Sequence, residues 1–200
     1  MSIVHGEEGY YVDEAVNMFE QYLPEADRDF NLYILYAPQV QPEQILDVCR
    51  RFPMMSERQV VIVKEMQAVS ADYGEKLSGY VSQPTATTML LLAGRGGALK
   101  SKGLVTTAKA HGAAVIEAKR VDERSVAPLI SGYVKSKGLA IEAKGLSMLR
   151  DYVGTDLSRL YNEIAKLAIV LPPGATITPE VIERNIGISK DYNNFELIDA

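Results

Sequence analysis

Cysteine, histidine and long apolar segments are all scarce in this sequence. Its 200 residues include one cysteine, Cys49, and two histidines, His5 and His111. A single cysteine excludes an internal disulfide and any zinc site built from several cysteines, and it suits a reducing cytoplasm. An apolar run such as residues 89–93 is far too short to cross a bilayer. The first residues lack the basic flank and apolar core of a signal peptide, so no membrane partner is expected.

Positive charge is also in short supply. The formal net charge is −5, which argues against a surface that coats DNA, since phosphate contacts need clustered lysines and arginines. A small basic patch remains compatible with this charge, and Lys100, Lys102 and Lys109 are predicted to make at most minor DNA contacts. Apolar residues make up 47% of the chain and charged residues 24%, which is typical of a globular protein.

Strands and helices alternate over the first part of the chain, residues 1–120. Strands are expected at 3–5, 32–37, 60–63, 88–93 and 114–118, with helices between them. Residues 60–63 are aliphatic at every position, as in a strand that is covered on both faces. The alternation predicts an α/β fold, a parallel sheet with helices on both faces.

Two helices of residues 1–120 have an apolar face that is predicted to pack in the core. The first helix begins near Tyr10, and its buried face is expected to consist of Tyr11, Ala15, Met18, Phe19, Tyr22 and Leu23. The second begins at Pro42 and is expected to bury Ile45, Leu46, Cys49 and Phe52.

Beyond Val121 the pattern changes to helices only, which predicts a small all-helical domain. Helices are expected at 125–137, 145–153 and 156–171, followed by a short one from Pro179. The last residues, 195–200, are typical of the first turn of an amphipathic helix. The chain is therefore interpreted as a fragment of a longer protein.

The first strand leads to a degenerate phosphate-binding loop (P-loop). A working P-loop places a lysine on the phosphates and a hydroxyl on magnesium. Here Gly6 and Gly9 enclose two glutamates, and Val12 and Asp13 stand where the lysine and the hydroxyl are needed. Carboxylates repel a triphosphate, so this loop is predicted not to bind ATP.

A second loop, Gly94–Ser101, matches the P-loop pattern except that Leu99 replaces its second glycine. A leucine obstructs the close approach of phosphate that glycine permits. A flexible basic surface loop is the favoured interpretation, and a nucleotide-hydrolysing protein that uses this loop is the alternative. No other pattern predicts a catalytic residue, a metal site or a cofactor.

An apolar turn interrupts this pattern at residues 50–59. Turns between helices and strands are normally polar, yet Phe52, Met54 and Met55 flank Pro53 here. Such side chains either pack under a neighbouring element or contact a partner. Phe52 is expected to point inward. For Met54 and Met55, the sequence pattern alone does not decide between packing in the core and contacting a partner.

Several segments together resemble the delta subunit of bacterial DNA polymerase III, the clamp-loader subunit that opens the sliding clamp. The similar segments are Gly6–Glu8, Phe52–Val63, Val153–Glu163, Thr176–Thr178 and Asp191–Leu197. Their order and spacing are more specific than any one of them. The Phe-Pro-Met-Met form is similar to the Bacteroidetes branch of the family.

The resemblance implies an AAA+ core without ATPase activity (1–120), a helical lid (121–187) and the start of a linker or collar helix (188–200). It implies no cofactor, no catalytic residue and no metal. The chain would be a non-catalytic subunit of the DNA-directed DNA polymerase III holoenzyme. Its partners would be the sliding clamp, other loader subunits through a C-terminal domain, and DNA in the assembled complex.

The resemblance also assigns the apolar turn. In the family, two bulky apolar residues before a Ser-x-Arg-Gln turn insert into a pocket of the clamp. These correspond to Met54 and Met55, with Phe52 and Arg51 as neighbours. One departure is that Ser158 stands where related ATPases keep a nucleotide-sensing arginine, which implies that nucleotide sensing is lost.

Overall fold

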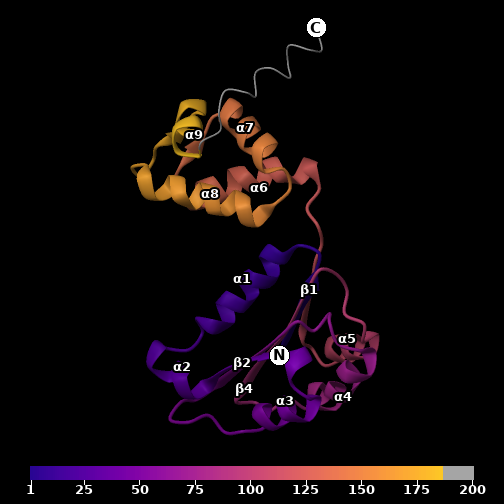
Figure 1. Ribbon diagram of the computed structural model, residues 1–200. Coiled ribbons are helices and arrows are strands. Elements are labelled where there is room, and N and C mark those ends of the chain that lie inside the picture. The colour runs from indigo at the N-terminus through magenta and orange to yellow at the C-terminus, as the bar shows by residue number, and fades with distance from the viewer. Residues whose placement is uncertain (187–200) are drawn as a thin grey trace. The chain divides into compact units, whose positions relative to one another are not determined.

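The computed structural model describes residues 1–186, and the chain divides into two compact units at residues 120 and 121. The first unit is built on a five-stranded parallel sheet in the order β2-β3-β4-β1-β5 (Figure 1). Its strands are β1 (Ser2–Gly6), β2 (Leu32–Tyr36), β3 (Gln59–Lys64), β4 (Thr88–Arg95) and β5 (Ala114–Ala118). The predicted parallel sheet is confirmed.

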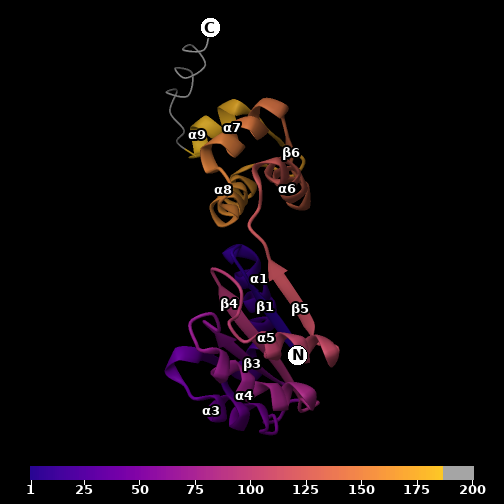
Figure 2. The same cartoon turned by 90° about the vertical axis from the view of Figure 1, so that its right-hand side faces the viewer.

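The sheet of the first unit has helices on both faces. They are α1 (Gly9–Glu20), α2 (Glu25–Asn31), α3 (Pro42–Cys49), α4 (Ala71–Ser82) and α5 (Lys102–Ala110), with a short 3₁₀ turn, η1 (Ala37–Gln39). Helix α1 covers one face, and α3, α4 and α5 cover the other, while β5 forms an edge of the sheet (Figure 2).

Side-chain alternation in β3 explains the two layers. Val61 and Val63 pack in the core beneath α3, α4 and α5, whereas Val60 and Ile62 pack against α1. All four side chains are fully buried. A strand covered on both faces has no solvent side, so the positions from Val60 to Val63 are all apolar. Strand β3 is therefore a rigid central element.

The predicted apolar face of the first helix is wrong in part. Helix α1 buries Val12 and Val16, while Met18 is exposed. Tyr22 is also exposed, because α1 ends at Glu20 and the chain then turns into α2. Helix α2 was not predicted, since its seven residues are mostly charged and carry no clear apolar period.

The second unit contains α6 (Glu123–Ser136), α7 (Ala143–Val153), α8 (Leu157–Val170) and α9 (Pro179–Ile186). Their inward side chains form one apolar core, which includes Ile130, Leu149, Leu160, Ile164 and Ile182. The expectation of helices alone is wrong in one respect, because β6 (Ala140–Ile141) pairs in parallel with β7 (Thr176–Ile177). The predicted linker or collar helix at 188–200 lies outside the described residues.

Within residues 1–186, no helix has the length and apolarity that crossing a membrane requires.

Candidate protein-binding site

The loop between α3 and β3, residues 50–58 (hereafter the apolar loop), exposes three large apolar side chains. Met55 is fully exposed, Phe52 is 85% exposed and Met54 is 57% exposed. The predicted inward position of Phe52 is wrong: α3 ends at Cys49, so Phe52 lies beyond the helix and does not continue its buried face. Arg51 is exposed beside these residues.

Buried polar side chains hold the base of the apolar loop. The amide of Gln59, the first residue of β3, donates hydrogen bonds to the carbonyls of Val48 and Arg51, both over 3.0 Å. It also reaches the hydroxyl of Thr88 at 2.8 Å. Because Gln59 is fully buried, water cannot replace these bonds. The start of the loop is thereby fixed to the central sheet.

A second contact supports the end of α3. The hydroxyls of Thr88 and Tyr80 donate to the carbonyl of Cys49, at 2.8 and 3.2 Å. This carbonyl belongs to the last turn of a helix, where main-chain acceptors lack partners within the helix. Burial raises the pKa of the Cys49 thiol to about 12, so the thiol stays protonated and packs as an apolar group.

Asn31, at the end of α2, holds the tip of the apolar loop. Its side-chain carbonyl accepts from the Met54 N–H at 2.7 Å, and its side-chain amide donates to the Met54 carbonyl at 2.9 Å. The main chain of Met54 is therefore paired as it would be in a sheet. The side chain of Met54 is left free to project outward.

Met55 has an unusual main-chain conformation. Its φ of 54° lies in the left-handed region, which costs a non-glycine residue about 1–2 kcal/mol. Strain of this kind persists where the surrounding structure fixes it, and it clusters at binding sites. The conformation directs a fully exposed apolar side chain away from the domain.

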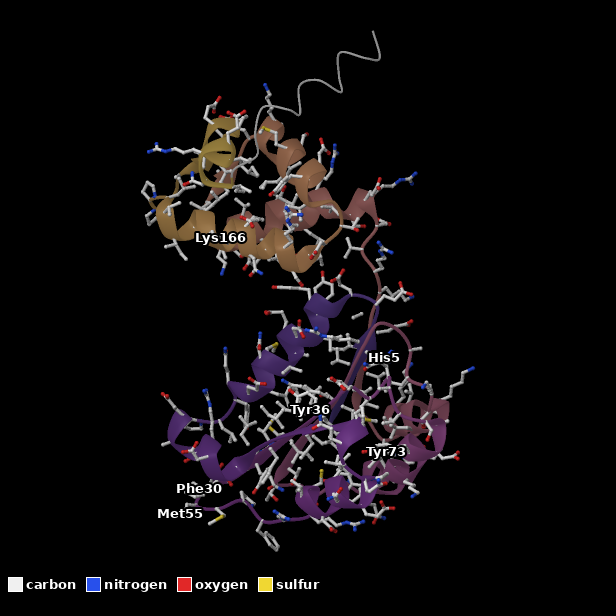
Figure 3. All side chains as sticks on the ribbon, viewed as in Figure 1. His5, Phe30, Tyr36, Met55, Tyr73 and Lys166 are labelled. Carbon is white, nitrogen blue, oxygen red and sulfur yellow. The ribbon has the colours of Figure 1, made fainter. Side chains whose placement is uncertain are left out.

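Two further features at this end of the first unit are not predicted from the sequence. Phe30, next to Asn31, is 57% exposed and lies at the same end as Met55 (Figure 3). An open groove of about 680 Å³ runs beside Met55, with Tyr22, Pro24 and Arg58 among its lining residues. The sequence alone does not reveal the exposed Phe30 or the groove, because both depend on the position of α2 beside the apolar loop.

The degenerate P-loop is filled by the protein itself. The Glu8 carboxylate accepts from the Tyr10 N–H at 3.2 Å, so it occupies the N-terminus of α1, where a nucleotide phosphate would bind. On the other side, a Cβ at Gly6 would collide with the main chain of Ala118. Gly9 is the first residue of α1. This turn has neither the charge nor the space for a phosphate.

The Gly94–Ser101 loop is also closed. Leu99 is buried in the core and lies against Gly94. The Ser101 hydroxyl donates to the Glu75 carboxylate at 2.7 Å, and the Gly103 N–H donates to the same oxygen at 3.1 Å. A carboxylate thus occupies the N-terminus of α5. The geometry gives the alternative nucleotide site no support.

Comparison with known proteins agrees with this arrangement. A family model described as DNA polymerase III, delta subunit, matches residues 3–119. The chain belongs to the DNA polymerase III delta subunit family. The match covers most of the first unit, including the apolar loop and the degenerate P-loop.

Two relatives extend over nearly the whole delta-family chain. DNA polymerase III subunit delta of Bacillus subtilis (strain 168) is 24% identical, over 98% of this chain and 59% of its own length. The solved structure of the Bacillus subtilis DNA clamp loader delta protein superposes with a TM-score of 0.77 at 25% identity, over 99% of this chain and 61% of its own. The chain therefore spans about 60% of these relatives, and its fold is similar to that of the clamp loader delta protein.

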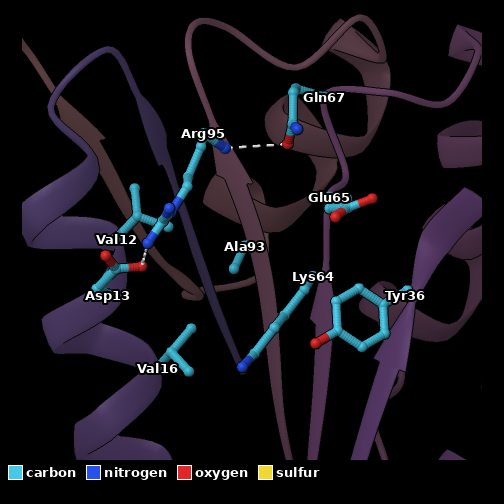
Figure 4. Close-up of a pocket in the computed structure, with 9 residues that line it drawn as sticks. All are labelled: Val12, Asp13, Val16, Tyr36, Lys64, Glu65, Gln67, Ala93 and Arg95. Atoms are coloured by element: carbon cyan, nitrogen blue, oxygen red, sulfur yellow. Dashed lines mark hydrogen bonds and ion pairs between the residues drawn. The ribbon is translucent and has the colours of Figure 1, made fainter.

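The delta-family chain also has a small cavity of about 260 Å³ at the carboxyl edge of the sheet (Figure 4). An ion pair joins Asp13 to Arg95 across it, and the Arg95 N–H donates to the Gln67 side chain at 2.9 Å. The hydrogen bond that the Arg95 guanidinium donates to the Asp13 carboxylate raises the pKa of Arg95 above its usual value. Lys64 is paired with Glu20 at 3.3 Å. Each of the two cations already has a carboxylate partner.

The remaining predicted residues belong to other elements than the apolar loop. Lys100, Lys102 and Lys109 are exposed on α5 and the segment before it. Arg159, one place after Ser158, stacks on the ring of Tyr152 at 4.4 Å. Within residues 1–186, no group of His, Cys, Asp and Glu side chains is arranged to hold a metal ion.

Proposed function

We propose that this chain is the clamp-binding part of a clamp-loader delta subunit, which binds the sliding clamp and opens it for loading onto DNA. Met54 and Met55 insert into an apolar pocket of the clamp, and Phe52 and Arg51 contact the rim of that pocket. The observation that carries the proposal is a fully exposed Met55 on a main chain held at both base and tip.

The energy available to such a contact is substantial. Burying a methionine side chain contributes about 1.5–3 kcal/mol, and a pair of them is enough for an interface hot spot. Methionine is flexible and adapts to a preformed pocket. Because the apolar loop is already ordered, little of this energy is lost in fixing its main chain.

In this proposal, the free energy gained by burying the two methionines is used to open the ring of the clamp. A ligand that contacts the open clamp better than the closed one shifts the clamp toward the open form. Rigid strand β3 and buried Gln59 support the loop, so strain at the interface falls on the clamp. Other loader subunits handle ATP, join this subunit through its C-terminal domain, and present DNA in the assembled complex.

The delta-family chain itself hydrolyses no ATP in this proposal. Glu8 and Glu75 place carboxylates at the two helix N-termini that a P-loop would use for phosphate. Titration with Mg-ATP tests this statement. Hydrolysis, or tight binding that Lys100→Ala removes, would instead support the nucleotide-hydrolysing alternative at the Gly94–Ser101 loop.

A pull-down with the cognate sliding clamp tests the proposal as a whole. The chain of residues 1–200 is expected to retain the clamp from purified components. Failure to retain it, with the chain folded by circular dichroism, would remove the assignment.

Minor DNA contacts through Lys100, Lys102 and Lys109 are tested by DNA binding at physiological salt, where a weak and salt-sensitive contribution is expected.

A further inference from the structure

Among residues 1–186, Asn31 is the buried polar side chain that joins a helix to the tip of the apolar loop. It is 1% exposed, and its carbonyl and amide pair with the N–H and carbonyl of Met54 at 2.7 and 2.9 Å. The amide also donates to the Asp27 carbonyl within α2, at 3.2 Å. Each polar atom of this side chain therefore has a partner.

Side-chain packing does not explain how the loop tip keeps its shape. The side chains of Phe52 and Met55 are almost fully exposed and that of Met54 is 57% exposed, so they bury little apolar surface that could fix the main chain. Met55 is held in a strained left-handed conformation that it would leave if the tip were free. The paired bonds to Asn31 are the contact at the tip that can maintain this arrangement.

We propose that Asn31 is a positioning residue for clamp binding. It acts through Met54, by holding the main chain of the methionine pair in its binding conformation before the clamp arrives. This inference rests on the proposed function and adds a specific role for α2. The helix carries no contact to the clamp at this position, because the Asn31 side chain is fully enclosed by α2 and the loop.

Removal of the side chain is the first test. Asn31→Ala is expected to weaken clamp affinity about tenfold, because ordering two loop residues on binding then opposes association. Asn185→Ala is the matched control: its side chain also donates to a carbonyl four residues earlier, that of Val181, at 2.7 Å. The control should leave clamp affinity unchanged. Equal affinities for Asn31→Ala and the wild type would overturn the proposal.

An isosteric variant separates positioning from folding. In Asn31→Asp, a carboxylate cannot donate to the Met54 carbonyl, but a protonated carboxyl both donates and accepts. Clamp affinity of this variant is therefore expected to recover as pH falls through the pKa of the new carboxyl. Titratable groups nearby are Asp27, Glu57 and Arg58, which line the adjacent groove and are common to both proteins. The effect of these three groups on clamp affinity therefore cancels in the ratio of the affinity of Asn31→Asp to that of the wild type at each pH.

Hydrogen exchange provides a measurement that needs no clamp. The Met54 N–H should be protected in the wild type and exchange at least about tenfold faster in Asn31→Ala, while amides of β3 stay unchanged. Equal Met54 exchange would overturn the positioning role, whatever the clamp does. A wild-type chain that binds no clamp would overturn the proposed function instead. If the pH recovery is absent in Asn31→Asp while the wild type binds, the positioning role is wrong.

Discussion

The side-chain amide of Gln59 donates a hydrogen bond to the main-chain carbonyl of Arg51 over 3.0 Å. Gln59 is the first residue of β3, whose first five residues are buried, and Arg51 lies in the exposed part of the apolar loop. One buried side chain thus links the central sheet to the surface that we assign to the clamp. The loop base and β3 behave as a single rigid element.

Replacing Gln59 by leucine should loosen this base. The Val48 carbonyl would keep the Arg51 N–H as a donor, but the Arg51 carbonyl would lose its donor from Gln59. An acceptor left unsatisfied away from water costs about 1–3 kcal/mol. Urea unfolding of Gln59→Leu should show a loss of that size, with weaker clamp binding. Gln39→Leu, at an exposed glutamine, is the control and should change stability by less than about 0.5 kcal/mol. Equal stability of both variants would contradict the role of Gln59.

Met55 should respond to mutation with opposite effects on stability and on binding. Glycine accepts the left-handed conformation without strain, so Met55→Gly should leave the free energy of unfolding unchanged or raise it by up to about 1 kcal/mol. Clamp affinity should fall, because the exposed thioether side chain is gone. A variant that loses stability, or one that binds the clamp as the wild type does, would count against this description of the loop tip.

Asp122 should make the second unit sensitive to acid. It caps α6 by accepting from the Ser125 N–H at 2.8 Å, and hydrogen bonds from Ser125 hold its pKa below the usual 3.8. A lowered folded pKa adds stability above the unfolded value, and this stability is lost as pH falls through the folded value. Asp122→Asn keeps an N-cap that does not titrate.

The measurement for Asp122 is thermal unfolding from about pH 6 to about pH 2, around the ordinary carboxyl pKa. The stability advantage of the wild type over Asp122→Asn should shrink as pH falls below 3.8. A constant difference across this range would show that the cap contributes nothing through its charge.

The strands β3 and β4 were predictable because each contains a short aliphatic run between polar turns. Such runs report burial on both faces, which is a local property of the sequence. The boundary of α3 was not predictable to the residue. The helix ends at Cys49, which is followed by arginine rather than by the glycine that usually marks a helix C-terminus, so the prediction places Phe52 on the wrong side.

The methionine pair is predicted from the apolar composition of its turn and from the family resemblance. The Asn31 hydrogen bonds that hold the main chain of this pair are not predicted from the sequence. Asn31 and Met54 are 23 residues apart, and hydrogen bonds between a side chain and a distant main chain leave no periodic pattern. The short β6–β7 pair was missed for a similar reason, since two residues per strand show no alternation.

The proposed clamp contact is tested by titrating the cognate clamp with the wild-type chain and with the Met54→Ala/Met55→Ala variant. Both side chains are exposed, so the free energy of unfolding should change by less than about 0.5 kcal/mol. Clamp affinity should fall by about 100-fold or more, since two buried methionines contribute at least about 3 kcal/mol. An unchanged dissociation constant in a folded double variant would contradict the assignment of Met54 and Met55 to the clamp.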